Sequence, residues 1–81
     1  MKNEIVQYEV FPNPANDVLN FKLKENCISI EILSLDGKTL ALENVIGMSA
    51  KINTSNLNSG VYMFKITNDK GLVSTNKFVK K

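Results

Sequence analysis

The sequence has no histidine, no tryptophan, no arginine and a single cysteine. Without histidine it cannot form a Ser-His-Asp triad or a Cys-His pair, and one cysteine cannot form a disulfide within the chain. A structural zinc site needs about four cysteine or histidine ligands, which this chain does not have. Arginine dominates the reading of nucleic-acid bases, so nucleic acid is not expected as a partner. We therefore expect a protein that is not an enzyme and that uses no metal, cofactor or small-molecule substrate.

Long apolar segments are missing as well. The longest apolar run, residues 61–64, has four residues, whereas a membrane-spanning helix needs about 20. The first residues lack the apolar segment of a secretion signal, which indicates either a cytoplasmic protein or a piece of a longer one. Apolar residues make up 43% and charged residues 22% of the 81 residues, as in one small folded domain. We expect that domain to be ordered over about residues 5–79.

The sequence does contain apolar and polar residues that alternate with period two, in seven segments separated by turn residues. Such alternation predicts half-buried strands, and no segment keeps a helical period for ten residues. The fold class expected from this pattern is all-β, a seven-stranded antiparallel β-sandwich without a disulfide. The expected strands are residues 6–10, 19–23, 28–32, 38–42, 50–53, 62–66 and 72–79.

The phase of the alternation predicts the core, but it leaves two faces undecided. Residues 61–64 are apolar on both sides, as in a central strand partly covered by loops or in an exposed stripe for a partner. In the last strand Leu72 and Phe78 share one face and Val73 and Val79 share the other. The sequence does not decide which of these faces is buried. The expected core residues are Leu19, Phe21, Ile28, Ile30, Ile32, Ile52, Tyr62, Phe64 and Ile66.

Two motifs predict chain reversals. Pro12, Asn13 and Pro14 end a strand, because proline fixes φ and removes a hydrogen-bond donor, and they predict a type I turn over residues 13–16. This motif is interpreted as an edge-strand terminator, with a docking role for the rigid segment as the alternative. Asp36 and Gly37 stand between apolar runs and predict a β-hairpin.

Gly60 and Tyr62 stand at the entry to the sixth expected strand. Gly60 is expected to supply a backbone shape that a Cβ atom disfavours. Tyr62 resembles the tyrosine corner of Ig-like sandwiches, whose hydroxyl bonds to backbone a few residues upstream, here near residues 57–58. Phe64 stands where antibody domains carry a cysteine, and the lone Cys27 is interpreted as a small buried hydrophobe.

The sequence ends with Lys77, Phe78, Val79, Lys80 and Lys81. One interpretation is a last strand followed by a solvated basic tail. The other is a recognition segment, in which three lysines favour an acidic receptor surface, two apolar residues anchor it, and a free sheet edge accepts a receptor strand. On the second interpretation, removing residues 77–81 is expected to stop export while leaving the domain folded.

In this order the motifs resemble the type IX secretion C-terminal sorting domain, type A, of Bacteroidetes. The resemblance runs from about Tyr8 to Lys81. The segments that carry it are residues 11–15, Asp17 and Leu19; residues 30–32 and 36–38; residues 55–57, 60–62, 65–66 and Gly71; and residues 77–81.

The resemblance implies an Ig-like sandwich that directs an upstream cargo protein, through the periplasm, to the type IX machinery at the outer membrane. Its partners would be the translocon and a sortase-like peptidase, and its destination the cell surface or the medium. The alternative is an Ig-like accessory module that binds carbohydrate or protein, although most aromatic residues have the phase of the core. The expected recognition residues are Gly60, Tyr62, Lys77, Phe78, Val79, Lys80 and Lys81, and the structural motif residues are Pro12, Asn13, Pro14, Asp36 and Gly37.

Overall fold

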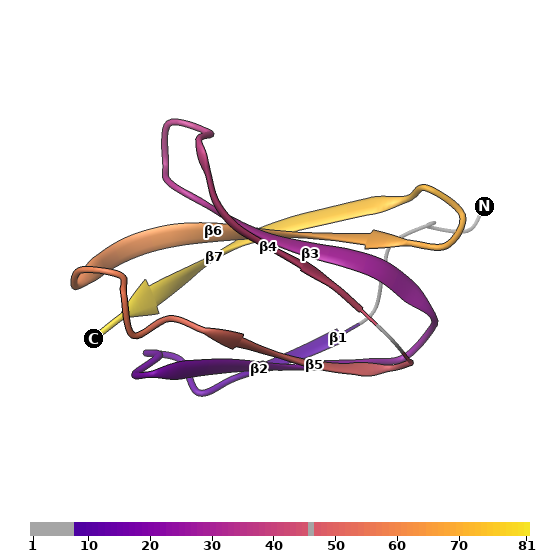
Figure 1. The fold of residues 1–81 in the computed structure, drawn as a ribbon, viewed down its shortest axis with the longest axis horizontal. Coiled ribbons are helices and arrows are strands. Elements are labelled where there is room, and N and C mark those ends of the chain that lie inside the picture. The colour runs from indigo at the N-terminus through magenta and orange to yellow at the C-terminus, as the bar shows by residue number, and fades with distance from the viewer. Residues whose placement is uncertain (1–7, 46) are drawn as a thin grey trace.

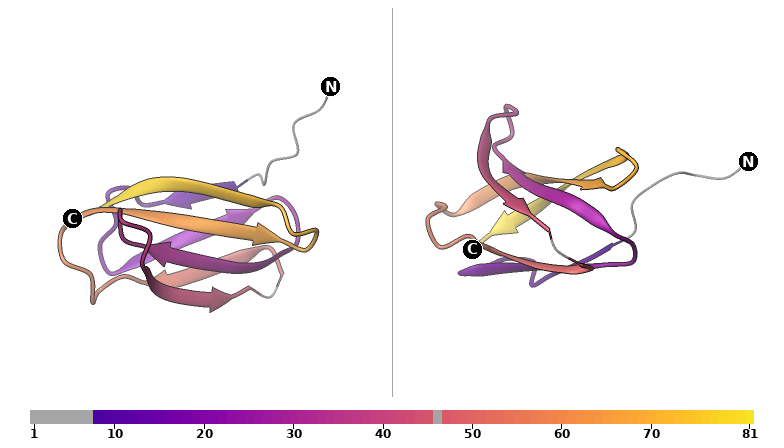
Figure 2. Two further views of the ribbon diagram at one scale, coloured as in Figure 1. Left: turned by 90° about the horizontal axis from the view of Figure 1, so that it is seen from above. Right: turned by 45° about the vertical axis from the view of Figure 1, so that its right-hand side comes forward.

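A computed structural model of the chain describes residues 8–45 and 47–81, which form two antiparallel sheets packed face to face (Figures 1 and 2). The three-stranded sheet has the order β1-β2-β5 and the four-stranded sheet the order β4-β3-β6-β7. Within the described residues there is no helix of the length and apolarity needed to cross a membrane. The strands are β1 (Tyr8–Phe11), β2 (Val18–Leu23), β3 (Cys27–Leu33), β4 (Thr39–Asn44), β5 (Ser49–Asn53), β6 (Gly60–Asn68) and β7 (Val73–Lys80).

The core lies between the two sheets and contains the inward-facing side chains of both. Phe64 on β6 contacts Tyr8 and Phe21 edge to face, with ring centroids 5.5 and 5.2 Å apart. These contacts join the two sheets, because Tyr8 and Phe21 belong to the three-stranded sheet. The predicted core is confirmed for Leu19, Phe21, Ile30, Ile32, Ile52, Phe64 and Ile66, whereas Tyr62 packs against it and is partly buried.

The prediction that Ile28 is a core residue is wrong, since 52% of this residue is exposed. The pairing of β3 with β6 shifts between Cys27 and Ser29, which is a β-bulge at Ile28. An extra residue in one strand shifts the alternation of its side chains by one position, so two residues three apart can face the same side. Cys27 and Ile30 therefore both face the core, and Ile28 is turned outward.

The hairpin predicted at Asp36 and Gly37 joins β3 to β4 and has a three-residue loop. Gly37 N donates to Ser34 O at 2.9 Å, and Ser34 N donates to Lys38 O at 2.9 Å. Only Gly37 has a positive φ, +92°, so the loop is not the two-residue type I′ turn, which needs positive φ at both central residues. Gly37 is required here because this conformation strains a residue with a side chain.

The hairpin between β6 and β7 depends on Asn68, a residue that sequence reasoning did not single out. Its side chain is fully buried, and its Oδ1 accepts hydrogen bonds from Lys70 N at 2.9 Å and Leu72 N at 2.8 Å. Its Nδ2 donates to Glu25 Oε1 at 3.0 Å. These bonds fix the turn, and β7 then pairs with β6 without a register shift from Thr67–Val73 to Gly60–Lys80.

Candidate recognition site

One end of the sandwich brings together the end of β7, the β1–β2 loop and the β5–β6 loop, near the C-terminus (Figure 1). Ala15, in the β1–β2 loop, is fully buried and forms a parallel bridge with Lys80. Ala15 N donates to Val79 O at 2.7 Å, and Lys81 N donates to Ala15 O at 2.8 Å. The loop thus lies along β7 like a very short extra strand and connects the two sheets.

Asn13 extends this connection, because its Oδ1 accepts a hydrogen bond from Val79 N at 3.1 Å. The predicted type I turn over residues 13–16 is wrong, since these residues form bends around the Ala15 bridge. The competing interaction is the pairing with β7, which uses the backbone groups of Ala15. The terminator interpretation is confirmed, because β1 ends at Phe11 directly before Pro12.

The tyrosine corner is present at the start of β6. Tyr62 OH donates to Asn58 O at 2.7 Å, as the sequence predicts. Gly60 has a φ of +156°, a conformation that residues with side chains rarely adopt. The Tyr62 ring stacks on Phe78 of β7, with centroids 5.8 Å apart and an interplanar angle of 26°. Tyr62 therefore fixes the β5–β6 loop and supports the last strand.

The last strand is part of the fold, so the prediction of a solvated tail is wrong for Lys80. Phe78 is 1% exposed and Lys80 is 8% exposed. Lys80 Nζ donates to Leu57 O at 3.1 Å, so the aliphatic stem is buried and the ammonium group is hydrogen-bonded. Val73 and Val79 are the outward residues of the strand. Removing residues 77–81 would remove Phe78 from the core, contrary to the expectation that the truncated domain stays folded.

Lys77, Val79 and Lys81 remain exposed at this end. The ion pairs within residues 8–45 and 47–81 are Lys24–Glu9 and Lys65–Glu31, both at 3.5 Å, and they do not include Lys77 or Lys81. The strand end therefore presents positive charge beside an apolar side chain, an arrangement complementary to an acidic surface.

Both interpretations of the apolar residues 61–64 hold in part for β6: it is a central strand, and part of its outer face is exposed. It is a central strand between β3 and β7, and Met63 on its outer face is partly covered. Val61 is 45% exposed and lies opposite Val79 in the register of β6 and β7. An exposed apolar pair thus lies next to Lys77, which places it at the edge of the candidate recognition site.

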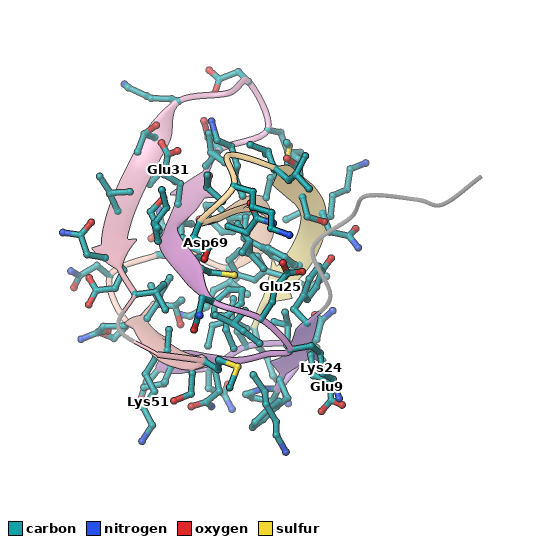
Figure 3. All side chains as sticks on the ribbon, turned by 90° about the vertical axis from the view of Figure 1, so that its right-hand side faces the viewer. Glu9, Lys24, Glu25, Glu31, Lys51 and Asp69 are labelled. Carbon is teal, nitrogen blue, oxygen red and sulfur yellow. The ribbon has the colours of Figure 1, made fainter. Side chains whose placement is uncertain are left out.

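Cys27 and the acidic residues form no catalytic arrangement in the described part of the chain. Burial raises the pKa of the Cys27 thiol, and the nearby carboxylates of Glu25 and Asp69 raise it further. Both carboxylates lie toward the end of the sandwich opposite the C-terminus, which faces the viewer in Figure 3. A raised pKa keeps the thiol protonated, and a protonated thiol is a poor nucleophile. Residues 8–45 and 47–81 contain no group of three metal-ligating acids or cysteines.

The fold and this end together define a small Ig-like β-sandwich whose last strand is bonded to its own sheet and to the β1–β2 loop. The family model described as "Secretion system C-terminal sorting domain" matches residues 9–81, and the chain belongs to this family. It is a sorting signal for type IX secretion, which interacts with the secretion machinery and directs export to the cell surface or the extracellular space.

Solved structures share the fold. One is PorZ, an essential bacterial surface component of the type-IX secretion system of Porphyromonas gingivalis, with 21% identity and a TM-score of 0.76. The match covers 91% of this chain and 11% of the PorZ chain. Another is CopC from Methylosinus trichosporium OB3b, with 14% identity, a TM-score of 0.52 and 91% of both chains covered. A comparison with curated proteins found no match.

Proposed function

We propose that this domain is read by the outer-membrane translocon and a sortase-like peptidase while it is covalently attached to an upstream cargo protein that has crossed the periplasm. Membership of the sorting-domain family supports this proposal. The PorZ match supports it too, because this chain spans only 11% of PorZ, so a domain of this fold occurs within a much longer protein. The domain itself is an address label without catalytic activity. The absence of histidine and the raised pKa of Cys27 support that part of the proposal.

The observation that carries the proposal is that three of the segments that carry the resemblance, in the β1–β2 loop, at the entry to β6 and at the end of β7, meet at one end of the sandwich. Asn13 and Ala15 bind the backbone of β7, and Lys80 binds the β5–β6 loop. In the proposed division of roles, Gly60, Tyr62, Phe78 and Lys80 hold the strand in place, whereas Lys77, Val79 and Lys81 contact the receptor. The first group is buried, partly buried or hydrogen-bonded, and the second group is exposed.

The test is a secretion assay with variants that change the exposed group and spare the core. The domain is fused behind a signal peptide and a fluorescent reporter in a host with type IX secretion. The variant combines Lys77→Glu and Lys81→Glu, and the matched control combines Lys38→Glu and Lys70→Glu, two exposed lysines in other loops. We expect at least a tenfold loss of surface reporter for the first pair, with the reporter retained in the periplasm, and normal export for the control.

The purified domains are melted in parallel so that a folding defect is recognised. Normal surface display of a folded K77E/K81E variant would contradict the proposed contact residues. Equal loss of export in the control pair would show that net charge, and not the end of β7, determines export.

A further inference from the structure

The outer face of the three-stranded sheet has a hollow that lies apart from Lys77, Val79 and Lys81. The hollow has a volume of about 480 Å³. It lies on β1, β2 and β5, in the sheet that does not contain β7. The residues that line it are Phe11, Asn20, Phe21, Lys22, Ser49, Ala50 and Lys51.

The strand register places the outward side chains of the hollow in two adjacent rows. Asn20 on β2 lies opposite Phe11 on β1 and opposite Lys51 on β5. Lys22, two residues along β2, lies opposite Ser49 on β5 and opposite Glu9 on β1. Neighbouring strands are about 4.8 Å apart, so the row from Phe11 to Lys51 spans about 10 Å.

Phe11 brings an aromatic ring to this face, and 49% of the residue is exposed. An exposed aromatic ring offers a flat apolar surface. Asn20 Nδ2 donates to Phe11 O at 3.2 Å, so the amide beside the ring has a fixed orientation. The ring and the amide thus place an apolar and a polar group side by side in the hollow.

The charge of the hollow is positive. Lys24, on the same strand, pairs with Glu9 at 3.5 Å, whereas Lys22 and Lys51 form no ion pair within residues 8–45 and 47–81. Figure 3 shows Lys51 projecting from the outer side of its sheet, far from Glu31 on the other sheet. Two ammonium groups at the border of a hollow attract an anionic ligand.

We propose that this hollow binds an acidic saccharide. The Phe11 ring packs against the C–H face of a sugar ring, the Asn20 amide and the Ser49 hydroxyl exchange hydrogen bonds with sugar hydroxyls, and Lys22 and Lys51 neutralise the acidic groups. Small polar ligands are held by a few placed polar groups on a mainly apolar lining, which describes these residues. A peptide strand fits less well, because the backbone groups it would pair with are used inside the sheet and are free only at sheet edges.

The test is a titration of the ¹⁵N-labelled full chain with tetragalacturonate, followed by amide chemical shifts. We expect saturable shifts confined to the lining residues of β1, β2 and β5. Maltotetraose, a neutral oligosaccharide, is expected to bind at least tenfold more weakly. Absence of saturable binding by tetragalacturonate, or equal binding by maltotetraose, would overturn the proposal. Inorganic phosphate is the third probe, and equal shifts at equal affinity would reduce the hollow to a simple anion site.

Variants separate the roles of ring and charge. Phe11→Leu keeps apolar bulk but removes the aromatic face, and we expect it to weaken tetragalacturonate binding at least fivefold. Lys22→Gln with Lys51→Gln should weaken it at least tenfold, whereas Lys38→Gln with Lys70→Gln should leave it unchanged. If the Lys22/Lys51 variant and the Lys38/Lys70 variant weaken tetragalacturonate binding equally, the ligand is attracted only by the net charge of the protein. That result would overturn the proposed site. Secretion of the fused reporter should be unaffected by Lys22→Gln with Lys51→Gln, so that result is independent of the sorting proposal.

Discussion

β4 and β7 are the two edge strands of the same sheet, yet they are held in different ways. In β7, Phe78 and Lys80 are buried, and the backbone of its last residues is bonded to the β1–β2 loop. In β4 no side chain is buried, and Leu42 is 59% exposed. β4 lies beside β3 through the Gly37 hairpin, and Thr39 Oγ1 donates to Glu31 Oε2 at 2.7 Å.

Both strands follow a hairpin, but β7 is held in addition by residues far away in the sequence. Asn13 and Val79, for example, are 66 positions apart. A strand held by distant contacts is sensitive to changes across the domain, and a strand held by its own hairpin is not. Substitutions of similar kind should therefore have unequal effects in the two strands.

The largest effect is expected for Phe78→Ala compared with Leu42→Ala. Truncation of a buried phenylalanine removes packing and leaves a cavity, which costs about 3–5 kcal/mol of unfolding free energy. That is a large part of the stability of a small domain. Leu42 is exposed, so its truncation should change stability by less than about 0.5 kcal/mol. Urea unfolding measures both values, and similar midpoints for the two variants would contradict the comparison.

A smaller effect is expected for Asn13→Ala, which removes the side-chain acceptor of Val79 N–H. A hydrogen bond of this kind contributes about 0.5–1.5 kcal/mol. Hydrogen exchange should show faster exchange at the Val79 amide, with the β4 amides unchanged. Asn16→Ala is the matched control, because Asn16 contributes its backbone oxygen, not its side chain, to the hydrogen bond from Thr54. Equal exchange at Val79 in both variants would show that Asn13 does not hold β7.

The smallest effect concerns Glu31, which connects β4 and β6 across β3. The hydrogen bond from Thr39, together with the nearby charge of Lys65, holds the Glu31 pKa below its usual 4.5. A lowered pKa in the folded state contributes stability above the unfolded pKa, and this contribution is lost as the pH falls through the folded pKa. We expect Glu31→Gln to lose about 0.2–1 kcal/mol at pH 7.

The same variant should approach the wild type in stability as the solution is acidified, because the wild-type carboxylate is then protonated as well. Unfolding free energies measured from pH 7 down to pH 2 test this. A gap between Glu31→Gln and the wild type that stays constant over the whole range would contradict the assigned cause.

The number and positions of the strands follow from the sequence, because period-two alternation and turn residues are local signals. Tyr62 and Gly37 were predictable for the same reason, since a turn or a strand entry is encoded within a few residues. Ile28 was not predictable, because the bulge that turns it outward depends on the pairing of β3 with β6. A prediction from periodicity alone assumes that the strand contains no extra, bulged residue.

The candidate recognition site was predictable as a set of residues, but not as an arrangement. The sequence marks Asn13 and Lys80 separately, and nothing in it shows that the two segments meet. Lys80 also contradicts the usual exposure of lysine, because its stem is covered and its ammonium group finds a carbonyl acceptor. Asn68 was missed because asparagine before a turn is common, and its burial is determined by contacts with distant residues.

The bridge between the β1–β2 loop and β7 also has a consequence for the rate of folding. Closing a loop between residues 66 positions apart costs chain entropy before any contact is gained. All-β domains rich in such non-local contacts fold in milliseconds to seconds, much more slowly than helical ones. A receptor that binds before this bridge forms would meet the end of β7 without the support of the β1–β2 loop.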